Sequence, residues 1–399
     1  MFLDALMRRN NEFLSAIGLL HQQGVLPANT YALDLNNIEK NAALIAHRGH
    51  ELGINVIAMM KQIGRNPDAC TAIKKGGITD AVAVDFECGI YSKKNGLEIG
   101  HIGHLVQIPK AFFNSTIELS PKNWTAFSIN HIQQISRIAK DRNVIQNIFL
   151  RVWNDNCKFY PGHEGGFHVK DLEETLIQIQ NISNVKVSGI TSFPALLFNK
   201  EKKKLEVTPN ADAINQASEK AENILGYQVI RNMPGTTSLV GLELLAENGA
   251  TQVEPGHGLT GTTPLSFFED TLEIPSVAYV SEVAHIHNGN AYVLGGGLYR
   301  DPVLGETPCK AVAIDSYGGM ETFDVDMPKP GAIDYYAILL PNNKGQVPPI
   351  GTTIVFGFRP QVFVTRGLTA GVSIEGNSPS MKKLYAANGA VSDVNWNKQ

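Results

Sequence analysis

The sequence has few of the features that would assign it to a specialised class of protein. Its four cysteines, Cys70, Cys88, Cys157 and Cys309, are far apart and form no Cys-x-x-Cys pair. We therefore expect reduced thiols in a cytoplasmic protein rather than a disulfide framework. No run of about 18 apolar residues is present, which excludes a transmembrane helix. Charged residues interrupt the apolar positions of residues 1–20, so no signal-peptide core is expected there.

The chain also lacks an excess of charge of either sign. Lys and Arg total 34, Asp and Glu total 38, and the formal net charge is -4 at pH 7. No basic field is therefore available to attract nucleic acid or an anionic membrane. With 43% hydrophobic and 18% charged residues, the chain can bury a large core, which excludes a disordered or fibrous protein.

Short apolar runs alternate with longer amphipathic segments over most of the chain. After a helix at 2–22, a strand at 31–35 and a helix at 36–52, we expect strands at 54–60, 80–84, 104–108, 126–129, 146–152, 185–190, 228–232 and 251–253. Helical spacing recurs between them, at 170–182, 211–225 and 237–248. Alternating strands and helices indicate parallel pairing. Eight such strands predict an α/β fold that closes into a (β/α)8 TIM barrel, although an open, doubly wound sheet is the alternative.

After about residue 270 the helical spacing disappears and turn signals become frequent. Residues 276–287, 291–294, 311–315, 334–340 and 353–358 have the composition of strands and lie between glycine- and proline-rich turns. We therefore expect a C-terminal all-β domain. The predicted organisation is an N-terminal segment, 1–35, that packs on the β-domain, a barrel at 36–268 and the β-domain at 269–399.

Two sequence features are expected at the C-terminal ends of barrel strands, where the active site of such a barrel is built. Lys61 directly follows the apolar run 54–60, and partial desolvation there would leave its amine neutral and nucleophilic. The segments 232–238 and 253–263, after the seventh and eighth strands, are rich in glycine and threonine. Such loops let backbone N–H groups approach a phosphate.

This constellation resembles the fold-type III pyridoxal-phosphate enzymes, which include alanine racemase, the ornithine and diaminopimelate decarboxylases and D-serine dehydratase. The resemblance is carried by Lys61 after the first strand and by Glu254-Pro255-Gly256 after the eighth, which matches the Glu-Pro-Gly-Arg of the decarboxylases. Residues 31–35, Tyr-Ala-Leu-Asp-Leu, resemble the segment that opens the racemases. The resemblance to the family covers about residues 30–265 well and the β-domain only in outline, and the chain as a whole resembles the YhfX-like group of alanine racemase relatives.

The resemblance implies roles for individual residues. Lys61 would form a Schiff base with pyridoxal 5'-phosphate, and Glu254 would contact its pyridine nitrogen. The residues expected to bind the cofactor phosphate are Gly235, Thr236, Thr237, Gly256 and His257. Arg65 and Thr260 stand at two positions where the racemases have tyrosines. A carboxylate at the pyridine nitrogen favours a carbanion at the substrate α-carbon, and its presence where alanine racemase has arginine argues against a plain alanine racemase.

The remaining candidates concern the substrate and the second subunit. Arg151 could bind a substrate carboxylate or form a structural salt bridge, and Tyr160 and His163 lie in a loop expected to face the substrate. Family members complete the site with a residue from a second subunit, for which Tyr299 and Cys309 are the candidates, so a homodimer with shared active sites is expected.

No metal site is expected. His285 and His287 would point to the same face of one strand, but no third ligand suggests itself.

The expected function is therefore a pyridoxal-phosphate-dependent amino-acid racemase or epimerase. A decarboxylase and a β-elimination lyase are alternatives that use the same cofactor chemistry. A non-catalytic carrier of pyridoxal phosphate is a candidate of a different class, and so is a barrel hydrolase without a cofactor. The sequence does not identify the amino acid.

Overall fold

The computed structural model describes residues 1–295, 309–327, 335–359, 368–376 and 378–392. The chain forms two compact units. Unit 1 consists of Met1–Asn41, Lys61–Ala72 and Thr260–Gln399, and unit 2 consists of Ala42–Met60 and Ile73–Leu259. No helix in the described part of the chain is both long and apolar enough to cross a membrane.

Unit 2 contains a parallel barrel, in agreement with the predicted fold class. Its strands are β2 (Asn55–Val56), β3 (Ala58–Met59), β4 (Asp80–Ala83), β5 (Glu98–Ile102), β6 (Trp124–Ala126), β7 (Gln146–Trp153), β9 (Val185–Thr191), β12 (Ile230–Asn232) and β13 (Gln252–Val253). The hydrogen-bonded order runs β2-β13-β12-β9-β7-β6-β5-β4-β3. Because β2 and β3 are successive parts of one segment, the sheet returns to its starting point and closes.

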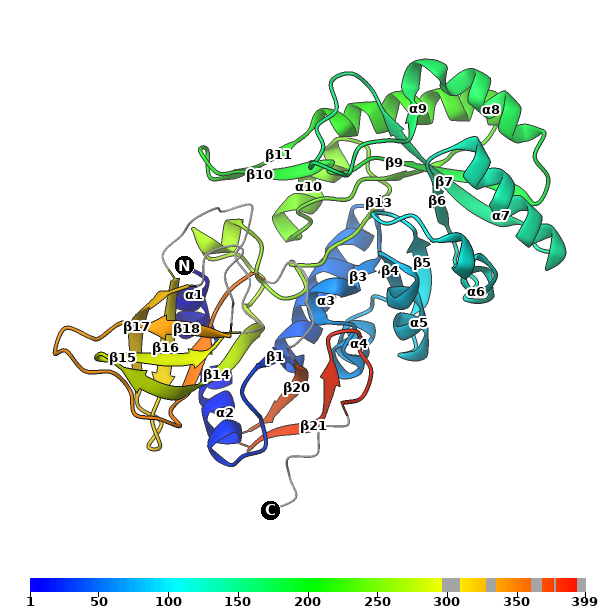
Figure 1. The fold of residues 1–399 in the computed structure, drawn as a ribbon. Coiled ribbons are helices and arrows are strands. Elements are labelled where there is room, and N and C mark those ends of the chain that lie inside the picture. Colours follow the sequence, from blue (N-terminus) through cyan, green and yellow to red (C-terminus); the bar gives the residue numbers. More distant parts are fainter. Residues whose placement is uncertain (296–308, 328–334, 360–367, 377, 393–399) are drawn as a thin grey trace. The chain divides into compact units, whose positions relative to one another are not determined.

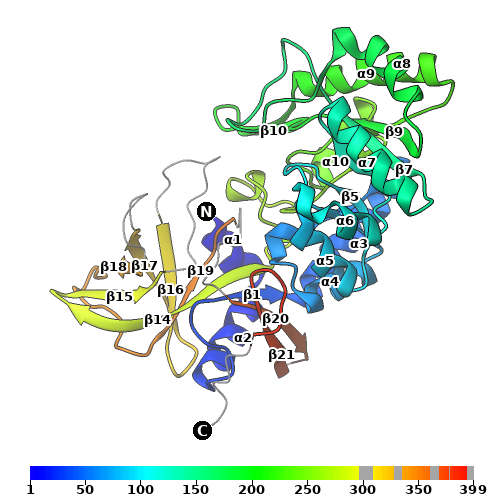
Figure 2. The ribbon, with the colours of Figure 1, turned by 45° about the vertical axis from the view of Figure 1, so that its right-hand side comes forward.

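Helices and short connecting strands separate the barrel strands (Figure 1). Helix α3 (Leu35–Glu51) precedes the first barrel strand. The helices between the strands are α4 (Pro67–Lys75), α5 (Phe86–Lys94), α6 (Phe113–Glu118), α7 (Ile129–Asp141), α8 (Leu172–Gln180), α9 (Pro209–Leu225) and α10 (Leu239–Glu247). The short strands are β8 (Phe167–His168) beside β7 and the hairpin of β10 (Leu196–Asn199) and β11 (Lys204–Val207). In α7, Ser128 caps the first turn, and Ile132, Ile135 and Ala139 form the buried face. Both α7 and α9 pack against β7 and β9 (Figure 2).

The predictions for the third and fourth barrel strands were wrong. The third strand is Glu98–Ile102 instead of 104–108, and the fourth is Trp124–Ala126 instead of 126–129, where α7 begins. Gly100 weakens the strand signal of β5, and it lies in a tight place, because a Cβ atom there would lie 3.1 Å from side-chain atoms of Asp80 and Ile57. Tertiary packing thus overrides local strand propensity.

Unit 1 contains the mainly antiparallel β-sheet that was expected after the barrel. Its strands are β1 (Thr30–Asp34), β14 (Val277–His287), β15 (Asn290–Leu294), β16 (Cys309–Ile314), β17 (Met320–Asp326), β18 (Tyr336–Leu339), β19 (Thr353–Phe356), β20 (Leu368–Glu375) and β21 (Ser378–Ala386). Their order is β15-β18-β17-β16-β19-β14-β1-β20-β21, and β14 also pairs with β15, which closes part of the sheet into a ring. The N-terminal strand β1 lies between β14 and β20, antiparallel to the first and parallel to the second.

The N-terminal residues form two helices, whereas the sequence predicted one helix at 2–22. Helix α1 (Phe2–Arg9) ends at Asn10, whose backbone leaves the helical region, and α2 (Asn11–Gln22) follows. The Asn10 side chain donates hydrogen bonds to Asp34 and to the Pro275 carbonyl, both at 2.8 Å. These tertiary bonds compensate for the interruption of the helix. Residues of both helices belong to the hydrophobic core of unit 1.

Candidate active site

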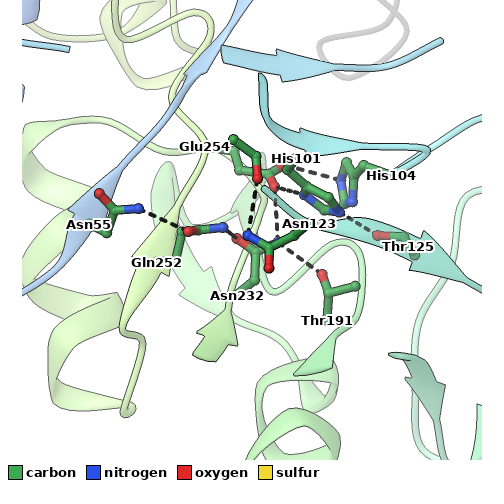
Figure 3. A network of polar contacts seen from close by, with 10 residues as sticks. Asn55, His101, His104, Asn123, Thr125, Thr191, Asn232, Gln252 and Glu254 are labelled. Carbon is green, nitrogen blue, oxygen red and sulfur yellow. Dashed lines mark hydrogen bonds and ion pairs between the residues drawn. The ribbon is translucent and has the colours of Figure 1, made fainter. Parts of the chain in front are cut away.

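The interior of the barrel holds a buried carboxylate. Glu254 directly follows β13 and is 3% exposed. Its Oε1 atom accepts a hydrogen bond from Asn232 Nδ2 at 2.9 Å and lies 2.6 Å from His101 Nδ1. The second ring nitrogen of His101 bonds to the Thr125 hydroxyl. Figure 3 shows these side chains converging from β5, β6, β12 and the end of β13. Glu254 is therefore held in place by groups from several strands.

Further polar side chains extend this network across the barrel (Figure 3). Asn55 donates to the side-chain oxygen of Gln252 at 2.9 Å, and the Gln252 amide donates to the side-chain oxygen of Asn232, Oδ1, at 3.1 Å. The Asn232 amide also donates to the Thr191 hydroxyl at 3.0 Å. Such networks are stable in an interior when their members find partners, and they then fix side-chain orientation.

The network keeps Glu254 ionised. Burial alone would raise the pKa of Glu254, but the charges of His104 and His101 and the hydrogen bonds from His101 and Asn232 outweigh burial and lower this pKa to about 2. The second carboxylate oxygen, Oε2, lies 3.3 Å from His104 Nε2. It accepts no hydrogen bond from the described residues. One oxygen is thus held by the protein, and the other can accept a bond from a ligand.

His101, His104 and Glu254 also have the composition of a metal site. Ligand atoms of His101, His104 and Glu254 all lie within 4.8 Å of one another, and all three residues are buried. The direct contact between His101 and Glu254 is a hydrogen bond, however, and both atoms would have to separate to coordinate an ion. The geometry seen here is that of a hydrogen-bonded carboxylate.

The two glycine-rich loops of unit 2 meet at the start of α10. Ser238 caps this helix and accepts a hydrogen bond from the Gly241 amide. Just before the cap, the Thr237 hydroxyl is buried and has no hydrogen-bond partner among the described residues. Gly258, from the second loop, approaches so closely that a Cβ atom there would lie 2.8 Å from the Thr237 carbonyl. Gly235 is equally constrained, because its Cβ atom would lie 2.3 Å from the Leu196 carbonyl.

The strand that leads to Lys61 lies next to the segment that carries Glu254. The Met59 amide donates to the Pro255 carbonyl at 2.9 Å, which continues the pairing of β2 with β13. Lys61 follows two residues later in a short 3-10 helix, Met60–Ile63, and its side chain is half-buried. The lysine therefore follows the segment of the barrel that adjoins the Glu254-Pro255-Gly256 motif.

The other predicted cofactor-binding residues lie in different units. Gly256 and the half-buried His257 belong to unit 2, whereas Arg65 and Thr260 belong to unit 1. Within unit 1, Arg65 has a left-handed backbone and its guanidinium lies 3.5 Å from the Ala387 carbonyl. The Thr260 hydroxyl bonds to that of Thr262 at 2.8 Å.

The structure brings together the three residues that were predicted to face the substrate. Arg151 on β7 is 1% exposed and donates to the carbonyls of His163 and Phe193, at 2.7 and 3.3 Å. The rings of Tyr160 and His163 lie 5.8 and 6.1 Å from the Phe193 ring. Phe193 also contacts His104, with ring centroids 5.5 Å apart. This aromatic cluster therefore adjoins the polar network around Glu254.

Arg151 is an unusual buried cation. Its guanidinium lies over the rings of Phe127 and Phe159, and burial lowers the pKa of Arg151 to about 10. No salt bridge joins it to a carboxylate among the described residues, and its Nε atom has no hydrogen-bond partner there. The alternative prediction, a structural salt bridge, is therefore not observed in the described part of the chain.

The residues predicted to act from a second subunit are both in the C-terminal region. Tyr299 lies outside the described residues. Cys309 begins β16 and is half-buried. His285 stacks on Tyr292, with ring centroids 4.5 Å apart. Neither His285 nor His287 belongs to a metal-binding group among the described residues.

Sequence reasoning missed the two histidines and the asparagine that surround Glu254. The predicted third strand began at His104, so His101 lay outside it. The signal that could have revealed the pair is His101-Ile-Gly-His104 itself, since Gly103 has a left-handed backbone suited to the end of a strand. Asn232 was recognised only as the start of a loop, because its contact with Glu254 comes from barrel closure.

The sequence matches two family descriptions. Residues 33–264 match "Alanine racemase, N-terminal domain", and residues 278–381 match "YhfX-like, C-terminal domain". The chain is 33% identical over 371 residues to a protein of Escherichia coli (strain K12) named "Uncharacterized protein YhfX", with 92% of each chain covered.

Solved structures share the fold at low sequence identity. The D-threonine aldolase from Filomicrobium marinum is 12% identical, with a TM-score of 0.63 over 91% of this chain and 96% of that one. An alanine racemase of Clostridium difficile 630 is 18% identical, with a TM-score of 0.63 over 90% and 98%. The D-threo-3-hydroxyaspartate dehydratase from Delftia sp. HT23 is 14% identical, with a TM-score of 0.64 over 89% and 97%. These proteins perform different reactions on one architecture.

Proposed function

We propose, on the premise that the chain belongs to the alanine racemase family of pyridoxal-phosphate enzymes, that it is an amino-acid racemase or epimerase. The observation that carries the proposal is Glu254. An ionised carboxylate at the ring nitrogen keeps that nitrogen protonated and strengthens the cofactor as an electron sink. Removal of a proton from the α-carbon of an amino acid gains from this arrangement, as does any step that leaves a carbanion at that atom.

The residues of unit 2 fit the cofactor in two respects. The Glu254 Oε2 atom is buried without a hydrogen bond from the described residues, which suits a partner that brings its own N–H group. The Thr237 hydroxyl is likewise buried without such a partner and lies at the N-terminus of α10, where a phosphate is stabilised by the helix dipole and by backbone N–H groups. Gly235, Thr236, Gly256 and His257 are proposed as the other phosphate-binding residues in this unit.

Lys61 is proposed as the residue that holds the cofactor and moves the proton. When bound, pyridoxal phosphate withdraws electrons from the bonds to the substrate α-carbon. The amine of Lys61 would take up or return the α-proton on one face. Racemisation needs a second proton carrier on the other face, and Tyr299 or Cys309 of the partner subunit is proposed for it. Arg65 and Thr260 complete the proposed set of cofactor-binding residues.

The loop after β7 is proposed to bind the substrate. A buried guanidinium that has no carboxylate partner among the described residues suits an anionic group, and amino acids carry one. Arg151 would attract the substrate carboxylate, while Tyr160 and His163 would form the wall next to it. Substitution of Arg151 by Gln should then raise KM more than it lowers kcat, provided that the loop keeps its conformation.

Decarboxylation is the second candidate reaction, because Glu254-Pro255-Gly256 matches the motif of the decarboxylases. The two reactions, and the β-elimination of a lyase, can be separated by incubating the protein with pyridoxal phosphate and single amino acids in deuterium oxide. Racemisation predicts deuterium at the α-carbon together with loss of optical activity. Release of carbon dioxide would instead identify a decarboxylase, and formation of a 2-oxo acid with ammonia would identify a lyase. A protein that binds the cofactor without any of these reactions would be a carrier.

A further inference from the structure

The hydrogen bonds around Glu254 are distributed unequally between its two oxygens. Oε1 receives hydrogen bonds from His101 and Asn232, whereas Oε2 accepts none from the described residues. A carboxylate that is held through one oxygen presents the other in a fixed direction. The carboxylate is thus oriented before any ligand arrives.

His101 is itself held by a second bond. Its Nε2 atom bonds to the Thr125 hydroxyl, and its ring lies 4.9 Å from the Phe149 ring. Nδ1 must donate in order to bond to a carboxylate, and Nε2 bonds to the Thr125 hydroxyl whether the ring is charged or neutral, because a hydroxyl can both donate and accept. The order Thr125, His101, Glu254 therefore fixes the orientation of the imidazole. All three residues are buried.

His104 limits what can approach the remaining oxygen. Its Nε2 atom lies 3.3 Å from Glu254 Oε2, and its ring is 5.1 Å from the His101 ring and 5.5 Å from the Phe193 ring. The two imidazoles thus lie against the carboxylate, one bonded to Oε1 and the other close to Oε2.

This inference rests on the proposed function. We propose that His101 is a positioning residue, which Thr125 orients and which holds Glu254 so that Oε2 remains the acceptor for the ring nitrogen of pyridoxal phosphate. His101 acts through Glu254 and does not itself contact the substrate. The charge and the orientation of Glu254 would then depend on a residue of the third barrel strand.

Two substitutions of His101 distinguish the roles of its two ring nitrogens. In His101→Asn the amide N–H group takes the approximate position of Nδ1, so the bond to Glu254 can persist. In His101→Gln the amide reaches toward the position of Nε2, so the contact with Thr125 is favoured over the bond to Glu254. Thr125→Val removes the hydroxyl that orients the ring. His131→Asn is the control, because His131 is also buried in unit 2 and packs against Phe113 and Trp124.

The readout is the affinity of the full-length protein for two ligands, measured by absorbance titration. One is pyridoxal phosphate, and the other is its analogue with a C–H group in place of the ring nitrogen. We expect His101→Gln to weaken binding of pyridoxal phosphate by about tenfold, the effect of losing one well-aligned bond to a charged group. It should leave binding of the analogue unchanged. Thr125→Val should act in the same direction, while His101→Asn and His131→Asn should bind both ligands like the wild type.

Several results would overturn this role. If His101→Gln lost affinity for both ligands equally, His101 would only support the fold, and thermal unfolding of the variants would show a matching loss. If pyridoxal phosphate bound equally well to all variants, the inference alone would fail. If the wild type bound neither ligand, the proposed function would fail together with it. One equivalent of zinc retained by the wild type and lost from His101→Gln would identify the three groups as a metal site.

Discussion

Glu254 is an acidic side chain in the interior of a barrel, where an ionised group is costly unless it is paired and hydrogen-bonded. Two imidazoles and one amide provide that compensation. Replacing any one of them leaves a charge that is only partly compensated. A carboxylate supported in this way is typical of a functional site, because an apolar residue would fill the same space at lower cost.

Another buried histidine, His131, has no hydrogen-bond partner for its ring among the described residues and should make the stability of the protein depend on pH. Burial lowers the pKa of His131 to about 4, whereas a histidine in the unfolded chain has a pKa near 6.5. The unfolded state therefore gains a proton first as the pH falls. The stability contributed by neutral His131 is complete above pH 6.5 and is lost as the pH falls towards 4. Urea unfolding should show a loss of about 2 kcal/mol between pH 7 and pH 5 from this residue.

The matched control for this pH dependence is His131→Leu, which removes the titrating group but keeps an apolar side chain. Its unfolding free energy should change less than that of the wild type over the same pH range. Equal changes in the two proteins would show that other groups cause the pH dependence. Glu254 would act in a different window, because its pKa of about 2 means that its contribution is lost only as the pH falls below about 4.5.

Gly235 is required by a close backbone approach. A Cβ atom there would lie 2.3 Å from the Leu196 carbonyl oxygen, which cannot move without shifting β10. We expect Gly235→Ala to destabilise the protein by about 1–3 kcal/mol and to weaken pyridoxal phosphate binding, as titration would measure. Gly318→Ala, at an open turn, should cost stability through its positive φ and leave cofactor binding unchanged. Unaltered affinity in Gly235→Ala would contradict the proposed phosphate site.

At the scale of elements, the barrel strands were predictable where apolar residues run continuously. Strands β7 and β9 were predicted to within one residue at each end, because parallel strands are buried on both faces. Strand β5 was not, because its sequence, Glu-Ile-Gly-His-Ile, contains a glycine and a histidine that only the packed barrel requires. The apolar residues in 104–108, which follow β5, gave a stronger local signal for a strand.

Local sequence patterns also determined how much of the candidate site could be predicted. Lys61 and Glu254 are each marked by a local pattern, an apolar strand before the lysine and Glu-Pro-Gly after the glutamate. His101 has no such pattern, since its function would arise from a partner 153 positions away in the sequence. Local spacing cannot reveal a pair that only closure of the barrel brings together.

Helix α2 should contribute strongly to the stability of unit 1. Phe13 is fully buried and belongs to the core that α2 shares with the β-sheet. Phe13→Ala should therefore lower the free energy of unfolding by about 3–5 kcal/mol. Leu19 is on the same helix but is 43% exposed, so Leu19→Ala is a matched control with an effect of about 0.5 kcal/mol or less. Similar losses in the two variants would mean that α2 does not pack as described.

At the scale of the molecule, unit 1 joins distant parts of the chain. Strand β1 lies between β14 and β20, so the N-terminal residues and the C-terminal region fold together. The segment after Lys61 belongs to the same unit, and Asn66 donates a hydrogen bond to Thr369 on β20 at 3.0 Å. The residues around the proposed catalytic lysine therefore depend on strands near the C-terminus.

A shared active site predicts that inactive variants can complement one another. We expect a homodimer by sedimentation or light scattering. If Cys309 of one subunit serves the Lys61 site of the other, then Lys61→Ala and Cys309→Ala should each be inactive. Mixed dimers of the two should regain activity, because one of their sites is intact. The same test applies to Tyr299→Phe. A fully active monomer would contradict the shared site.

The absorption spectrum of the purified protein with pyridoxal phosphate tests the central claim most directly. Covalent attachment to a lysine predicts a band near roughly 420 nm. The band should be absent from Lys61→Ala, and reduction with borohydride should attach the cofactor permanently to the peptide that contains Lys61. Lys74→Ala, at an exposed lysine in α4, should keep the band. A wild-type protein that stays colourless with added cofactor, or a Lys61→Ala variant that keeps the band, would contradict the account.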